Sequence, residues 1–186
     1  MPTADLENAR AELEAAGKGS GRWAFMIDTD LAQDALMRRR YDEAVTLLLR
    51  LADEGRRVRR DSHRMCWVLG ALAVTLLELR RHTEAHSAVR EMLPHALQSS
   101  MLAPLAHLVG WYLADTGRPD DAALLVGAGD CTAANPVRRI VENVRPYAMT
   151  LLETALPAAR LAALLAEGAQ IDERTLGRIA RGDARR

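Results

Sequence analysis

Two histidines one helical turn apart, in the segment HTEAH at positions 82–86, have the spacing that could most directly support chemistry. Imidazoles four residues apart on a helix can reach the same zinc ion. The metalloprotease pattern places a glutamate directly after the first histidine, whereas Glu84 stands one position later and points to another part of the helix. We therefore interpret the segment as the start of a helix. A metal-dependent enzyme using His82 and His86 is the alternative.

A second segment whose residues could support chemistry is GAGDCT at positions 127–132. A phosphate-binding loop needs a preceding strand, a third glycine at a fixed offset or a following lysine. None of these accompanies Gly127 and Gly129, so we expect a turn that ends a helix. Of the two cysteines, Cys66 lies in an apolar run and Cys131 has no base beside it in the sequence. We predict no catalytic residue, no metal site and no cofactor, and hence no enzyme.

The composition narrows the class of protein further. The chain has 186 residues, of which 49% are hydrophobic and 27% are charged, enough for one packed domain. With 25 basic and 25 acidic residues the formal net charge is zero. This argues against non-specific electrostatic binding to nucleic acid. The last predicted helix carries three arginines, Arg174, Arg178 and Arg181, and we interpret it as a solvent-exposed helix. A DNA-reading helix is the alternative there.

We expect no secretory signal at the start of the sequence and no membrane-spanning segment within it. The segment MPTADLENAR at the start has no apolar core, and no apolar run reaches the roughly 18 residues of a membrane span. We therefore expect a cytoplasmic protein that has no contact with membranes.

The chain repeats itself. The segments RRYDEAVTLL, RRHTEAHSAV and TGRPDDAALL each place an alanine before an apolar run, at Ala44, Ala85 and Ala122. The alanines are 41 (85 − 44) and 37 (122 − 85) residues apart, and a repeat of this length indicates stacked helical repeats. Twelve residues before each alanine stands a small residue, which lets two helices approach closely. The aligned sets are Ala32, Ala73 and Gly110 at the small position, Ala35, Leu76 and Leu113 nine residues before the alanine, and Leu48, Val89 and Val126 four residues after it.

This pattern resembles the tetratricopeptide repeat over roughly residues 22–130. The resemblance implies an all-α fold, a right-handed α-solenoid of about three helix hairpins with a C-terminal helical cap. We expect an N-terminal helix and hinge over 1–21, the three helix pairs over 22–130, and the cap over 131–186, all in one compact domain. The expected helices are 3–16, 23–39, 41–54, 63–80, 83–98, 101–115 and 120–126, then one from Pro136 that is kinked at Pro146, and two short helices starting at Pro157 and after Asp172.

The C-terminal part carries a second resemblance. DDAALLVGAGD and ALPAARLAALLAEGAQIDERTLGRIA are similar to the C-terminal helical region of large ATP-binding LuxR-type transcriptional regulators of bacteria, over about 35 residues. The tryptophan that usually precedes AEG in that region is Leu165 here. The resemblance implies the sensor or interaction segment of such a regulator. A free-standing adaptor protein is the alternative.

The first helices of tetratricopeptide pairs line a concave groove, so the resemblance also implies a binding surface. It would take a peptide, a protein partner or a small inducer, and no nucleic acid directly. Trp67 or Trp111 could instead fill the core between helices. Because the N-terminal helix is a poor cap, we also expect a homodimer through the Ala- and Leu-rich helices near one end. The implied groove residues are Met26, Gln33, Met37, Trp67, Val74, Glu78, His107, Trp111 and Asp115.

Overall fold

The computed structural model describes residues 3–19, 21–58, 60–132 and 141–183, and over these residues the protein is helical without strands. The prediction of an all-α fold is confirmed. Across the same residues, no helix combines the length and the hydrophobicity needed to cross a membrane. The helices are α1 (Thr3–Ala15), α2 (Arg22–Met37), α3 (Tyr41–Arg57), α4 (Ser62–Glu78), α5 (His82–Gln98), α6 (Ala106–Asp115), α7 (Pro119–Cys131), the 3₁₀ turn η1 (Glu142–Val144), α9 (Arg145–Ala155), α10 (Ala158–Gly168) and α11 (Glu173–Arg181).

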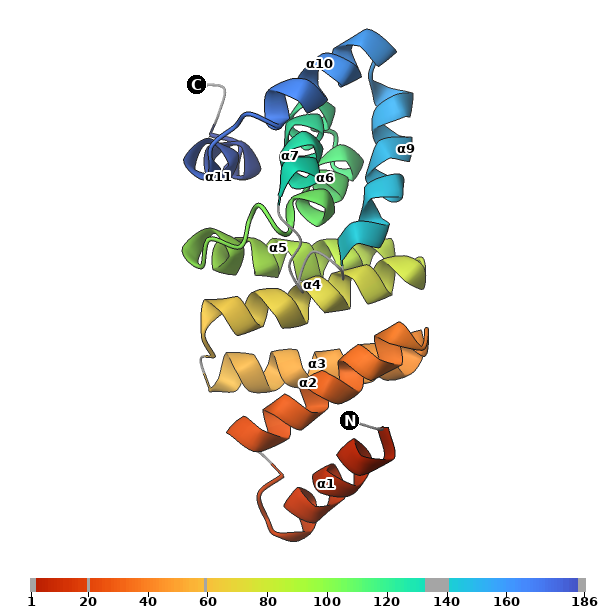
Figure 1. Ribbon diagram of the computed structural model, residues 1–186, viewed down its shortest axis with the longest axis vertical. Coiled ribbons are helices and arrows are strands. Elements are labelled where there is room, and N and C mark those ends of the chain that lie inside the picture. The colour runs from red at the N-terminus through yellow and green to blue at the C-terminus, as the bar shows by residue number, and fades with distance from the viewer. Residues whose placement is uncertain (1–2, 20, 59, 133–140, 184–186) are drawn as a thin grey trace.

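Consecutive helices pack in pairs. Extensive contacts join α4 to α5, α6 to α7 and α2 to α3, and α7 also packs extensively on α10. In Figure 1, α1 to α5 are stacked along the long axis, and α6 and α7 are turned away from the direction of α4 and α5. The contact between α5 and α6 is correspondingly small. The helix α9 stands along α6, and α10 lies against α7.

The small residues aligned in the sequence lie at the helix crossings. Ala44, Ala85 and Ala122 are all fully buried, as expected where the two helices of a pair cross closely. In the third pair the contact is direct, because a Cβ placed on Gly110 would lie 2.9 Å from Val126 Cγ2 and 3.2 Å from the carbonyl oxygen of Ala122. A larger side chain at this position would push the two helix axes apart.

The turn inside each pair has the same backbone geometry. Its left-handed residue is Arg39, Arg80 or Gly117, with φ of 58°, 58° and 82°. In each turn the next N–H donates back across the helix end, as from Arg40 to the Ala35 carbonyl at 2.8 Å, with the same 2.8 Å in the other two pairs. This is the Schellman closure of a helix C-terminus. The repeat therefore extends to the hydrogen bonds of the turn.

An ion pair recurs beside each of these turns. The arginine that follows the left-handed residue reaches an acid three residues on, as Arg40 Nη1 does to Glu43 Oε2 at 2.8 Å and Arg81 Nε to Glu84 Oε1 at 2.7 Å. In the third pair Arg118 Nη2 lies 2.8 Å from Asp121 Oδ2 and also donates to the Ile179 carbonyl at 2.5 Å. Each pair is partly exposed, so solvent screening keeps its contribution to stability small.

Several helix boundaries differ from the sequence prediction. The helix α3 continues through Gly55, where a Cβ would meet the sulfur of Met65, and Pro94 lies inside α5. The expected turn at 127–130 belongs to α7, and α6 begins only at Ala106. Pro146 lies in the first turn of α9, directly after the 3₁₀ turn η1, where a proline costs no helical hydrogen bond. The predicted helix start at Asn135 and Pro136 lies outside the described residues.

The two ends of the fold are attached differently. At the C-terminal end, backbone meets backbone where α7 crosses α10, since a Cβ on Gly127 would lie 2.1 Å from the Leu165 carbonyl oxygen. At the N-terminal end, Leu6 is the one residue of α1 that is fully buried. A hydrogen-bonded ion pair holds α1 to α2 there, because Arg10 Nε donates to Asp28 Oδ1 at 2.6 Å. The two side chains are nearly buried, with 12% of Arg10 and 2% of Asp28 exposed.

Candidate functional site

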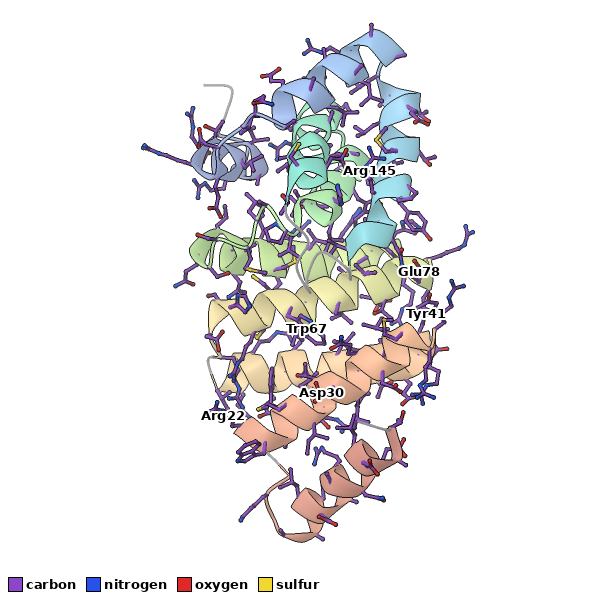
Figure 2. All side chains as sticks on the ribbon, in the orientation of Figure 1. Arg22, Asp30, Tyr41, Trp67, Glu78 and Arg145 are labelled. Atoms are coloured by element: carbon purple, nitrogen blue, oxygen red, sulfur yellow. The ribbon has the colours of Figure 1, made fainter. Side chains whose placement is uncertain are left out.

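The candidate site is the face that α2 and α4 form together. On α2 the residues of this face follow one another at helical spacing, from Arg22 through Met26 and Gln33 to Met37. On α4 the equivalent positions lie 41 residues later, from His63 onwards. Figure 2 shows Arg22 and Asp30 on α2 and Trp67 on α4 along the same side of the molecule.

A pocket of about 340 Å³ opens on this face. It brings together Met26, Gln33 and Trp67, three of the residues that the tetratricopeptide resemblance implied. Met26 is 42% exposed, and Trp67 is half-buried because it also packs against the core. The complete lining is Arg22, Phe25, Met26, Thr29, Asp30, Gln33, His63, Arg64 and Trp67.

The floor of the pocket is held by charged neighbours. Phe25 is 3% exposed, and the guanidinium of Arg60 lies over its ring at 4.7 Å from the centroid. Arg60 in turn pairs with Glu54, whose Oε1 is 3.2 Å from Arg60 Nη2. A cation over an aromatic face stabilises both groups by about 0.5–1 kcal/mol or more when partly desolvated. The floor is therefore a fixed apolar surface.

Beyond the pocket the same face is closed on α4 but open on α2. Val74 is 5% exposed, so it lines no open groove, whereas Met37 at the end of α2 is 79% exposed. Glu78 lies at the C-terminal end of α4 (Figure 2), close enough to Tyr41 to affect its ionisation. Burial raises the pKa of Tyr41, and the negative charge of Glu78 raises it further. On α4 the face is open at its N-terminal half, where Trp67 lines the pocket.

The structure corrects the groove prediction for α6. His107, Trp111 and Asp115 share one face of the helix, as their spacing predicts, but His107 and Trp111 are buried against other helices and Asp115 is exposed. Trp111 is 1% exposed and lies 5.0 Å from the ring of His86 on α5, while Asp115 Oδ2 is 2.8 Å from His86 Nε2. Figure 1 shows α6 turned relative to α4; Trp111 lies against His86 of α5, and His107 lies against Asp130 of α7. Trp111 is a core residue.

His107 belongs to a polar cluster that the sequence did not reveal. It is 3% exposed, and its Nε2 lies 2.9 Å from Asp130 Oδ1. Asp130 also receives two hydrogen bonds from Arg145, at 2.7 and 2.8 Å. Burial raises the pKa of Asp130, but the hydrogen bonds from Arg145 and His107 outweigh it and leave that pKa below its usual value. The cluster joins α6, α7 and α9, and it was not predictable because the partners are 15 and 23 residues from Asp130 in sequence.

A second, larger cavity of about 680 Å³ lies where α3 ends and α4 begins. It holds Ser62 and His95, a pairing that could suggest an activated nucleophile. However, Ser62 Oγ donates to Gln98 Oε1 at 2.6 Å. The 3.2 Å contact to His95 Nδ1 must then run from the ring nitrogen to the hydroxyl. His95 is therefore not placed as a base for Ser62.

The remaining reactive groups are not assembled into a site. His82 is exposed at the start of α5, and among the described residues no three His, Cys, Asp or Glu side chains cluster in a way that could hold a metal ion. Cys66 is buried 3.6 Å from Ser99 Oγ, and burial raises the pKa of its thiol. Cys131 is exposed at the end of α7.

No protein-family model, curated protein or solved structure matches this chain. The case for its function therefore rests on its own residues.

Proposed function

We propose that this protein is a non-enzymatic binding module of the tetratricopeptide type, which holds a peptide segment of a partner protein on the face formed by α2 and α4. The observation that carries the proposal is the pocket that Met26 and Trp67, from two consecutive first helices, line together with the buried Phe25. Large apolar side chains in a partly desolvated hollow are the usual anchors of protein–protein contacts.

The exposed apolar surface favours a peptide over a compact small molecule. Trp23 is 68% exposed and Met37 is 79% exposed, so exposed apolar side chains lie near both ends of α2, in addition to those of the pocket. A monomer that leaves large hydrophobic side chains in a row on one face marks an interaction site. A ligand that uses all of it must be extended. A small inducer confined to the pocket is the second possibility.

The wider role follows from the two resemblances. A binding module with a C-terminal region similar to that of LuxR-type regulators is suited to be the sensor segment of a transcriptional regulator. A free-standing adaptor would use the same face. The homodimer expected from the sequence stays a prediction, and light scattering at high protein concentration checks it.

The test is a selection of random twelve-residue peptides against the purified chain, followed by binding measurements with single variants. Trp67→Ala and Met26→Ala should each weaken the selected peptides at least about tenfold, as expected for anchor residues. The matched control is Leu49→Ala, which removes an apolar side chain of similar exposure, 42%, from another helix. Selected peptides that bind Trp67→Ala as well as the unchanged protein would place the binding surface elsewhere.

A further inference from the structure

The charges around the α2–α4 pocket are unevenly distributed. Its rim carries Arg22, His63 and Arg64 against a single acid, Asp30. The nearby α3–α4 connection is also rich in arginine, but Arg56 and Arg60 are paired there, with Glu91 at 2.7 Å and Glu54 at 3.2 Å. The rim arginines are less committed to partners inside the protein.

The two rim arginines are available to a ligand. Among the described residues none forms an ion pair with Arg22, which is exposed at the first position of α2. Arg64 Nε lies 3.3 Å from Asp61 Oδ2, and both side chains are well exposed, at 36% and 57%. Such a surface pair contributes little to stability, so a ligand carboxylate can replace Asp61 at low cost. Asp61 would still cap α4 through its other oxygen, which accepts from the Arg64 N–H at 3.0 Å.

From this charge complementarity we infer that the occupant of the pocket is an acidic peptide segment, in which a large apolar side chain is flanked by carboxylates. The inference rests on the proposed function and adds the chemistry of the partner. The apolar side chain would lie on Trp67 and Met26, and the carboxylates would pair with Arg22 and Arg64. An arginine presents two parallel N–H donors to a carboxylate, which gives orientation as well as attraction. The positive rim would also raise the association rate at low salt.

The experiment uses three labelled peptides with blocked ends, all containing the same leucine–phenylalanine pair. The pair is flanked by aspartate and glutamate in the first peptide, asparagine and glutamine in the second, and lysine in the third. Fluorescence anisotropy measures their affinities for the whole chain. The acidic peptide should bind at least about tenfold more tightly than the neutral one, and the difference should shrink with salt. The lysine peptide should bind most weakly.

Reversal of the rim charge sharpens the test. Arg22→Glu combined with Arg64→Glu should invert the order of the acidic and lysine peptides. Arg90→Glu, the same change at an exposed position of α5 outside the pocket, should leave the order unchanged. Circular dichroism melting verifies that each variant is folded, and Arg22→Gln alone, at an exposed site, repeats the test without charge reversal.

The outcomes separate this inference from the proposed function. Equal binding of all three peptides, abolished by Trp67→Ala, would overturn the acidic preference and leave the peptide-binding module standing. Tighter binding of the lysine peptide would also overturn it. Failure of every peptide to bind at about 1 mM, a concentration that detects contacts of about 4 kcal/mol, would overturn both.

Discussion

The crossing of α7 and α10 offers the sharpest test of the fold, because helix propensity and the observed packing predict opposite signs for a substitution there. Gly127 and Gly168 both lie inside or at the end of helices. In a helix interior, replacing glycine with alanine usually stabilises by about 0.5–1 kcal/mol. In the structure a Cβ on Gly127 would lie 2.1 Å from the Leu165 carbonyl oxygen, and a Cβ on Gly168 would lie 2.1 Å from that of Leu124.

The magnitude follows from this geometry. A carbon and a carbonyl oxygen in contact stand about 3.3 Å apart, so Gly127→Ala must separate the two helices by about 1 Å. The obstacle is backbone, which cannot move aside as a flexible side chain can. Overpacking of this kind costs about 1–3 kcal/mol, more than the gain in helix propensity. Because a single separation relieves both clashes, adding Gly168→Ala to the first variant should cost less than the sum of the two single changes.

Thermal and urea unfolding, followed by circular dichroism, measure the effect. For a chain of this length 1 kcal/mol corresponds to about 2–4 °C in Tm, so a drop of several degrees is expected. The control is Gly70→Ala, also buried and within a helix, where the nearest atoms are the side-chain ends Leu105 Cδ2 at 3.2 Å and Met92 Sδ at 3.4 Å. Its cost should stay below about 1 kcal/mol. A Gly127→Ala protein as stable as the unchanged one would refute the α7–α10 crossing.

Three further predictions follow from single residues. Arg80→Gly should raise the free energy of unfolding by up to about 1 kcal/mol in urea titrations, because φ is 58° there and the equivalent position of the third pair is glycine. Trp111→Ala should lower Tm strongly, at a cost of about 3–5 kcal/mol, whereas Trp67→Ala at a half-buried site should cost much less; equal losses would contradict the assignment of Trp111 to the core. Since the pKa of Asp130 is depressed in the fold, its stabilising effect is present above the unfolded pKa of about 3.9 and is lost as pH falls through the lower folded value. Asp130→Asn should remove that part of the acid dependence in melts between about pH 5 and 2.

The repeat was readable from the sequence because its causes are local. The small residues Ala44, Ala85 and Ala122 recur because the two helices of each pair cross closely at these positions. Each crossing depends on residues that are near one another in the sequence. The caps are local too, as Asp172 shows by accepting from the Thr175 N–H at 2.9 Å. A further local signal, the arginine three residues before the acid in each turn, was present in the sequence but became meaningful only with the ion pairs in view.

Helix ends were less predictable where a distant segment decides them. Gly127 and Gly129 suggest a stop, since glycine is a poor helix former. The helix α7 nevertheless continues through both, because Gly127 admits the backbone of α10 and Gly129 leaves room for the ring of His107, whose Nε2 would lie 2.8 Å from an added Cβ. Both partners are remote in sequence, so composition alone pointed the wrong way.

Trp67 and Trp111 show the same division between what the sequence and the tertiary structure determine for the site. Their spacing places both on equivalent faces of first helices, and helical periodicity determined that much. Whether such a face meets solvent depends on how one pair is rotated against the next, which is set by contacts between segments far apart in the chain. The second pair leaves Trp67 half-buried at a pocket, while the turn of the third pair places Trp111 against His86 and buries it. The sequence determined the helices, their pairing positions and their turns; the tertiary structure alone decided which face stays open.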